Sequence, residues 1–211
     1  MGIDTGAMFD RIVCINLDRR PDRWQQFLDS AGRHIPVERI IRFPAIDAER
    51  TLTPSWWEDT PGGWACSLSH RQVISDAAVD GAESLLVFED DALLADDFGE
   101  RLEAFLAAVP EDWYGLWLGG QHGPRFPPEP VGPGVVRCRR TIRMHAYALH
   151  ARAYQLVYDQ ICWETRISDQ AVADLHRHHP HFYAPDRFMV AQRASFSDVE
   201  AREHTDDRWW E

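Results

Sequence analysis

The sequence has 211 residues, of which 45% are hydrophobic and 27% are charged, and its formal net charge at pH 7 is -12. This length and composition indicate a single globular domain over residues 1–211 with one sizeable core. The acidic excess disfavours long nucleic acids and anionic membrane surfaces as partners, because those bind chiefly through Lys and Arg; a nucleotide needs only a few local positive charges.

The compartment is predicted from two further features. No apolar run is long enough to cross a bilayer, and residues 1–9 lack the basic and apolar regions of a secretory signal, so we expect a disordered lead-in there. Four widely spaced cysteines without a CxxC pair fit neither a zinc ribbon nor a disulfide scaffold. Reduced thiols in a cytoplasmic protein are the simplest interpretation.

The first half of the chain alternates between predicted strands and helices. Short apolar runs rich in β-branched residues predict strands at 11–17, 37–43, 84–88 and 114–118. Apolar residues at helical spacing predict helices at about 21–31, 65–79 and 98–109, the first beginning at Pro21 and ending before Gly32. Such alternation is typical of an α/β sandwich with a mostly parallel, mixed sheet.

The second half is more mixed. Five prolines and three glycines predict a long loop at 121–134, and loops of this length often bind ligands. Strands are expected at 135–137, 144–150 and 188–191, and helices at 151–162 and from an N-cap at Ser168 to about residue 177. Residues 176–181 (HRHHPH) invite a metal site, but we interpret this run as a solvated turn after a helix.

The sharpest motif is an acidic triplet, Glu89, Asp90 and Asp91, directly after the apolar strand 84–88. Ligands bind at the carboxyl ends of strands in open α/β sheets, and oxygen ligands suit Mg²⁺ or Mn²⁺ bridged to phosphates. The alternative is a solvated acidic loop that caps the next helix. The segment 15–23 (INLDRRPDR) favours the first interpretation, because it brings three arginines to the same edge, where they can meet a diphosphate.

At these residues the sequence resembles glycosyltransferase family 25, the lipooligosaccharide (lipopolysaccharide biosynthesis) and collagen-type galactosyl- and glucosyltransferases. Three blocks carry the resemblance: INLDRRPDR at 15–23, GWACSLSH at 63–70 and LVFEDD at 86–91. Weaker matches are DWYGLWLG at 112–119, HAYAL at 145–149 and Asp169. Trp64 and the proline-rich segment 124–133 depart from the family pattern.

The resemblance implies a single-domain GT-A (Rossmann-like) α/β/α sandwich and an inverting hexosyltransferase that uses Mn²⁺ or Mg²⁺ and a nucleotide-sugar donor; among such donors it favours a UDP-sugar. It implies that Glu89 and Asp91 bind the metal, with His145 or His204 as a third ligand, and that Asp169 is the general base. The implied donor-binding residues are Asn16, Leu17, Arg19, Arg20, Arg23, Ser69, His70 and Asp90. For His70 the alternative is a helix residue satisfied in the core, and for Asp169 a residue that stabilises a helix N-terminus.

The acceptor stays open between a glycan, a glycolipid and a hydroxylated polymer. The tail 195–211 is expected to cover the site, with residues 195–199 folding over the donor and Trp209 and Trp210 stacking on a sugar or on the body of the protein. Two other functions remain: a catalytically inactive nucleotide- or sugar-binding module, and a sugar nucleotidyltransferase. The latter normally has a glycine-rich basic loop near its N-terminus, which this sequence lacks.

Overall fold

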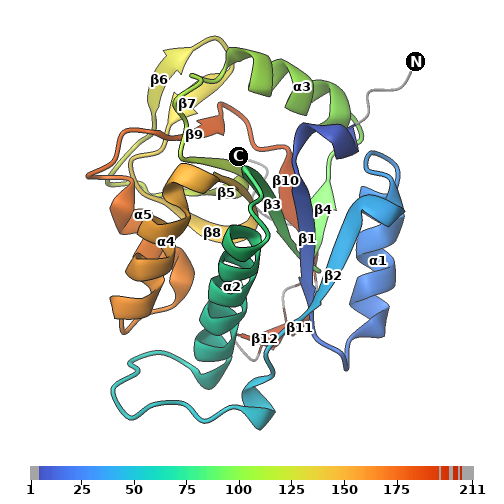
Figure 1. Ribbon diagram of the computed structural model, residues 1–211, viewed down its shortest axis with the longest axis vertical. Coiled ribbons are helices and arrows are strands. Elements are labelled where there is room, and N and C mark those ends of the chain that lie inside the picture. Colours follow the sequence, from blue (N-terminus) through green and yellow to red (C-terminus); the bar gives the residue numbers. More distant parts are fainter. Residues whose placement is uncertain (1–4, 195, 200–201, 204, 206–211) are drawn as a thin grey trace.

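The structure, a computed structural model, describes residues 5–194, 196–199, 202–203 and 205 (Figure 1). The α-helices are α1 (Pro21–Ala31), α2 (Pro61–Val79), α3 (Phe98–Ala108), α4 (Ala151–Trp163) and α5 (Ser168–Leu175). Short 3-10 helices span Thr5–Met8, Val37–Arg39 and Ala48–Arg50. The strands are β1 (Arg11–Asn16), β2 (Ile40–Pro44), β3 (Ser84–Glu89), β4 (Ala92–Leu94), β5 (Gly115–His122), β6 (Glu129–Gly132), β7 (Val135–Arg137), β8 (Thr141–His150), β9 (Phe182–Pro185), β10 (Val190–Gln192), β11 (Phe196–Ser197) and β12 (Arg202–Glu203).

Eight strands form one mixed sheet in the order β2-β1-β3-β8-β5-β9-β7-β6. Strands β2, β1, β3, β5, β9 and β6 run one way, and β8 and β7 run the other. Two-stranded sheets β10-β4 and β11-β12 lie outside it. The predicted α/β sandwich with a mostly parallel, mixed sheet is confirmed.

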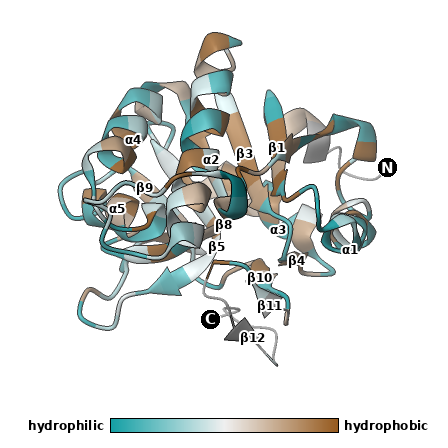
Figure 2. Ribbon diagram, turned by 90° about the horizontal axis from the view of Figure 1, so that it is seen from below, coloured by the Kyte–Doolittle hydropathy of each residue, from teal (hydrophilic) through white to brown (hydrophobic). Residues whose placement is uncertain are grey.

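Alternating side chains of the strands supply two separate cores. Leu86 and Phe88 of β3 pack with residues of α1 and α3 on one face. Leu85 and Val87 pack with residues of α2, α4 and α5 on the other face. Because both faces are covered, β1 and β3 are continuously apolar, and both appear brown between the helices in Figure 2.

Because β1, β2 and β3 are parallel, their carboxyl ends lie at the same edge of the sheet. Ile15 of β1 lies in register with Glu89 of β3, and Asn16 lies in register with Pro44 of β2. The segments that follow the three strands therefore begin at one edge of the sheet. Helix α2 begins near this edge, where Pro61 occupies its first turn and Thr60 accepts a hydrogen bond from the Gly63 amide at 2.9 Å.

Several sequence predictions differ from the structure. Residues 5–8 form a 3-10 helix and Phe9 is buried, so the described part of the lead-in is ordered by the core. The expected loop 121–134 contains β6, which pairs with β7. Ser168 is the first helical residue rather than the N-cap, and its amide donates to Ser67 Oγ at 2.9 Å. Strand β9 was not predicted, and β10 pairs with β4 instead of the main sheet.

His176 corrects the prediction of a solvated turn at 176–181. His178 is exposed, but His176 is only 2% exposed and packs against Trp117 and Phe182, with ring centroids 4.6 and 4.8 Å away. Its Nδ1 accepts a hydrogen bond from the Thr141 amide at 3.1 Å. Burial lowers the pKa of His176 to about 3. Within the described residues, none of the helices combines the length and apolarity that crossing a membrane requires.

The buried His176 predicts a pH-dependent stability. Its pKa is about 3 in the folded state and 6.5 in the unfolded chain, so the neutral ring stabilises the fold above pH 6.5 and this contribution is lost as the pH falls toward 3. At pH ~5 the loss is about 2 kcal/mol of unfolding free energy relative to pH ~8. In urea titrations, His176→Asn, whose amide oxygen can still accept from Thr141, should flatten this dependence. His178→Asn, at an exposed position, should leave it unchanged; equal profiles for the two variants would contradict the assignment.

Candidate active site

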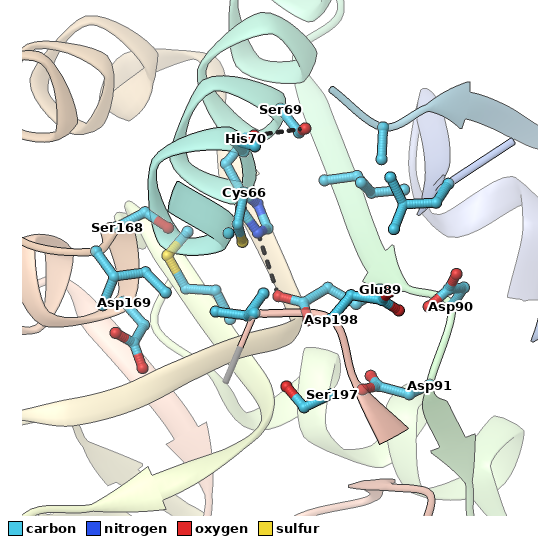
Figure 3. Close-up of a pocket in the computed structure, with 18 of the residues that line it drawn as sticks. Cys66, Ser69, His70, Glu89, Asp90, Asp91, Ser168, Asp169, Ser197 and Asp198 are labelled. Atoms are coloured by element: carbon cyan, nitrogen blue, oxygen red, sulfur yellow. Dashed lines mark hydrogen bonds and ion pairs between the residues drawn. The ribbon is translucent and has the colours of Figure 1, made fainter. Parts of the chain in front are cut away.

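A cavity of about 370 Å³ lies at the carboxyl edge of β1 and β3. Its walls come from the segments after these strands, the first half of α2, the beginning of β8 and of α5, and residues 197–199 of the tail (Figure 3). Most of the predicted site residues meet here, although they are far apart in the sequence. This is the edge at which open α/β sheets bind their ligands.

The three carboxylates of the triplet point to different partners. Glu89 ends β3 and faces α2, where Nε2 of His70 lies 3.2 Å from its Oε1. Burial is the largest single influence and opposes ionisation of Glu89, but the hydrogen bond with His70 and the positive charges of His70, His145 and Arg23 together outweigh it, so the pKa of Glu89 lies below its usual value. His70 is itself fully buried, and its Nδ1 lies 3.0 Å from the Tyr147 hydroxyl. Both ring nitrogens of His70 thus have partners within the protein, as expected from the alternative interpretation in which His70 is a helix residue satisfied in the core.

Asp90 is held inside the wall of the cavity. It accepts a 2.6 Å hydrogen bond from Nδ2 of Asn16 and forms an ion pair with Arg23, both side chains of this pair being 8% exposed. Burial raises the pKa of Asp90 to about 7; Arg23 opposes this shift and Asp91 adds to it. Asn16 is therefore placed to hold Asp90 rather than to face the cavity.

Asp91 has the carboxylate oxygen best placed for a further ligand. Its Oδ2 lies 3.0 Å from Nη2 of Arg23 and accepts from Nε2 of Gln192 at 3.3 Å. Its Oδ1 is buried and has no hydrogen-bond partner among the described residues. A buried carboxylate oxygen without a partner is costly, so a cation bound there would be stabilising. With Glu89 on the same rim, the donor set is made of oxygens and fits Mn²⁺ or Mg²⁺.

His145 does not line this cavity. It is buried beneath the cavity, where its Nε2 lies 3.1 Å from the Val190 carbonyl oxygen and its ring packs so closely on Gly119 that a Cβ there would clash. Nδ1 has no partner among the described residues. Its role as a metal ligand stays a prediction, and the other candidate, His204, lies outside the described residues together with Trp209 and Trp210.

The arginines of the first block converge on a carboxylate of the tail. Nη1 of Arg19 and Nη1 of Arg20 lie 2.6 and 2.9 Å from the two oxygens of Asp198, and Nη1 of Arg23 lies 3.5 Å from Oδ2. Arg19 also reaches Asp47 at 3.2 Å. An anion thus already occupies the cluster that we expected to bind a diphosphate, and it comes from the segment 195–199 that we expected to fold over the donor.

Two other predicted residues take supporting positions. Leu17 and Ser69 both line the cavity. The Ser69 hydroxyl accepts from the Ile46 amide and donates to the Ala65 carbonyl, both at 2.9 Å. Ser69 is fully buried. Its hydroxyl therefore fixes the loop after β2 against α2.

Asp169 lies across the cavity from the triplet, in the first turn of α5 (Figure 3). Its Oδ2 accepts from the Arg143 amide at 3.1 Å, and its Oδ1 is buried without a hydrogen-bond partner in the described part of the chain. Arg143 has φ 73°, a left-handed conformation that is strained for a residue with a Cβ. Burial raises the pKa of Asp169, opposed by the charge of Arg143. A carboxylate with a raised pKa and a free oxygen can accept a proton.

Sequence reasoning missed Cys66, Gln192 and Asp198 as site residues. Cys66 lies inside one of the quoted blocks and four residues before His70, a spacing that places both on one side of a helix. Gln192 reaches Asp91 only because β10 pairs with β4, and Asp198 reaches the arginines from nearly the other end of the chain. Neither contact has a local signal in the sequence.

Known proteins resemble this chain over most of its length. Residues 9–129 match the family model "Glycosyltransferase family 25 (LPS biosynthesis protein)". The inactive glycosyltransferase 25 family member 3 of Homo sapiens is 27% identical over 90% of this chain and 35% of its own length. The probable inactive member 3 of Rattus norvegicus is 28% identical over 90% of this chain and 37% of its own length. The chain thus spans about a third of these relatives.

Among solved structures, a glycosyltransferase involved in the glycosylation of the major capsid of PBCV-1 aligns with a TM-score of 0.48 and 9% identity, covering 83% of this chain and 81% of that chain. The family assignment does not depend on this likeness; it follows from the match over residues 9–129, which includes both the arginine block and the acidic triplet. The chain belongs to glycosyltransferase family 25.

Proposed function

We propose that this chain is a metal-dependent, inverting glycosyltransferase that transfers a hexose from a nucleotide-diphosphate sugar, a UDP-sugar, to an acceptor hydroxyl. One observation carries the proposal. Glu89 and Asp91 line one cavity together with Arg19 and Arg23, and Asp169 lies across the cavity from the two carboxylates (Figure 3). This arrangement supplies a place for a cation, positive charge for a diphosphate and a separate base.

In this proposal the acidic triplet and the arginines bind the donor. Mn²⁺ or Mg²⁺ held by Glu89 and Asp91 would offset the charge that develops on the leaving diphosphate. Arg19 and Arg20 would bind phosphate oxygens by charge-assisted hydrogen bonds after releasing Asp198. Arg23 keeps Asp90 and Asp91 in place, so its role is to position carboxylates as well as to lend charge to the donor site.

In this proposal Asp169 is the general base that activates the acceptor hydroxyl. Direct displacement with inversion requires that a base take the proton of the acceptor hydroxyl as the new glycosidic bond forms and the bond from the anomeric carbon to the diphosphate oxygen breaks. Asp169 has a buried oxygen available for this proton, and its raised pKa favours the transfer. A glycan, a glycolipid and a hydroxylated polymer all present such a hydroxyl.

A second candidate function is a nucleotide- or sugar-binding module without transferase activity. The observation in its favour is that the human and rat relatives are named inactive or probable inactive. The two functions differ in donor turnover. Slow hydrolysis of a UDP-hexose that depends on Mn²⁺ supports the enzyme, and tight binding without hydrolysis or transfer supports the module.

The donor site predicts metal-dependent binding of UDP. Calorimetric titration should give binding with Mn²⁺, none with EDTA, and at least about tenfold weaker binding for Asp91→Ala, roughly 1.4 kcal/mol. The matched control is Asp96→Ala, which removes a carboxylate 93% exposed to solvent. The proposed donor site would be wrong if UDP binding were unchanged by both EDTA and Asp91→Ala, or if no nucleotide bound under any condition.

The role of Asp169 predicts a separation of chemistry from binding. Asp169→Asn should lower kcat by about 10²- to 10⁴-fold while donor affinity and melting temperature stay close to wild type. The variant should also lose the acidic limb of the pH–rate profile. Asp186→Asn, at an exposed position, is the control. A fall in donor affinity as large as the fall in kcat would assign Asp169 to donor binding instead.

The contact between the tail and the arginines predicts competition with the donor. Because Asp198 occupies Arg19 and Arg20, Asp198→Asn should bind UDP several-fold more tightly than wild type in the presence of Mn²⁺. Asp18→Asn, which removes a carboxylate paired with Arg42 outside this cluster, should bind as wild type does. Weaker binding by Asp198→Asn would mean that Asp198 orders the arginines for the donor.

A further inference from the structure

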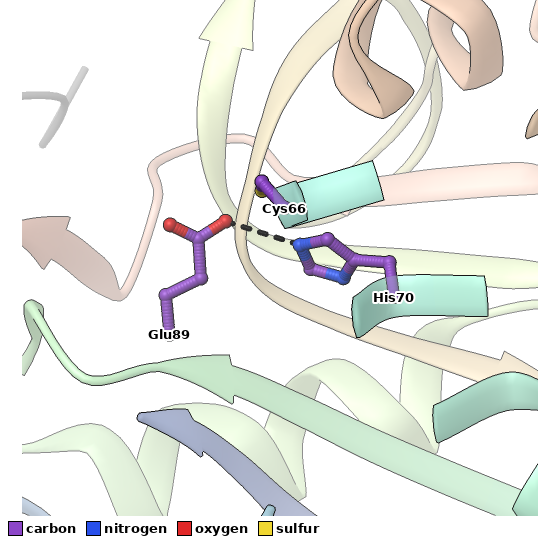
Figure 4. A group of neighbouring side chains, drawn as sticks. All are labelled: Cys66, His70 and Glu89. Carbon is purple, nitrogen blue, oxygen red and sulfur yellow. Dashed lines mark hydrogen bonds and ion pairs between the residues drawn. The ribbon is translucent and has the colours of Figure 1, made fainter. Parts of the chain in front are cut away.

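The cavity contains a second group of metal-ligating side chains besides Glu89 and Asp91. Cys66 and His70 lie one turn apart on α2, and both face Glu89 at the end of β3 (Figure 4). One ligand atom from each of Cys66, His70 and Glu89 lies within 4.8 Å of the other two. Small side-chain rotations would bring all three to bonding distance of a common ion.

The chemistry of this group differs from that of a site for Mn²⁺. A thiolate, an imidazole and a carboxylate are the three ligand types of zinc, which binds Cys at about 2.3 Å and His at about 2.0–2.1 Å. Hard ions such as Mn²⁺ and Mg²⁺ prefer oxygen and gain little from sulfur. With three protein ligands on one side, the fourth position of a tetrahedral ion would face the cavity.

His70 has the hydrogen-bonding arrangement that is usual for a histidine that binds a metal, in which one ring nitrogen is held by a neighbouring group and the other faces the site. Its Nδ1 lies 3.0 Å from the Tyr147 hydroxyl, which fixes the ring, and its Nε2 points at Glu89. Opposite an ionised Glu89, the favourable tautomer of a neutral His70 carries its proton on Nε2 and donates it to the carboxylate. Metal binding would move this proton to Nδ1, which would then donate to Tyr147, and would release the thiol proton of Cys66 to solvent.

We propose that Cys66, His70 and Glu89 form a zinc-binding site that shares Glu89 with the donor-metal site. Because Glu89 belongs to both sites, zinc should compete with the ion that binds UDP. This competition rests on the proposed function, whereas the zinc site itself does not.

The test is spectroscopic and needs no activity. Co²⁺, used as a probe for zinc, should give a thiolate-to-cobalt charge-transfer band with one equivalent bound, and added Zn²⁺ should displace it. Cys66→Ser, which keeps the size of the side chain, should abolish the band and weaken zinc binding at least about tenfold, roughly 1.4 kcal/mol. Cys162→Ser, at a partly exposed cysteine of α4, should keep both.

Two further variants separate this site from the donor site. Asp91→Ala should keep the band and lose Mn²⁺-dependent UDP binding, while His70→Asn should lose the band with circular dichroism and melting temperature as checks of folding. A band that survives in Cys66→Ser, disappears in Asp91→Ala, or never forms in the wild type would overturn the zinc site. Failure of UDP binding with an intact band would overturn only the proposed donor site.

Discussion

The ion pairs of Arg23 with Asp90 and Asp91 are the interaction on which the rest of the site depends. Strand β3 delivers three consecutive carboxylates to a poorly solvated edge, and their mutual repulsion has to be offset. Arg23 reaches them from the first turns of α1 and is 7% exposed. Removal of one partner from such a buried pair leaves an uncompensated charge, which costs several kcal/mol. Helix α1 and β3 are thereby fixed to each other by charge as well as by the core.

This constraint divides the triplet into three separate roles. Asp90 is occupied by Asn16 and Arg23, and Glu89 is turned toward His70, so within the triplet it is Asp91 whose buried oxygen has no partner among the described residues. The same guanidinium lies within 3.5 Å of Asp198 and so connects the triplet to the tail. A donor that draws Asp198 away from the arginines would therefore change the electrostatic surroundings of Asp91 and Asp90 together.

Local patterns in the sequence predicted the parts of the fold that depend on local physics. The apolar runs of β1 and β3 and the proline at the start of α1 were sufficient for the sandwich and for the edge at which the cavity lies. The family blocks contain most of the predicted residues that line the cavity, but Asn16, Arg20 and His145 do not line it. Long-range contacts were not readable. The burial of His176 depends on Trp117 and Phe182, and the contact of Gln192 with Asp91 depends on the pairing of β10 with β4. Strand β6 was not predicted because Pro130 and Gly132 are typical of loops, yet an edge strand tolerates such residues.

The position of Glu89 links the identity of the bound ion to the state of the site. Its carboxylate stands between the nitrogen and sulfur ligands of α2 and the carboxylate of Asp91, and in the proposed scheme it would contribute to the coordination of an ion on either side. A hard ion would draw Glu89 toward the donor side, and zinc would draw it toward Cys66 and His70. The hydrogen bond with His70 and the charge of its ring help to lower the pKa of Glu89 against the effect of burial, so a change at His70 would also alter the charge that Glu89 offers to a cation on the donor side. On the proposed scheme, retention of all three acidic residues would not by itself suffice for catalysis, because the ion bound by Glu89 would also decide whether the donor site is complete.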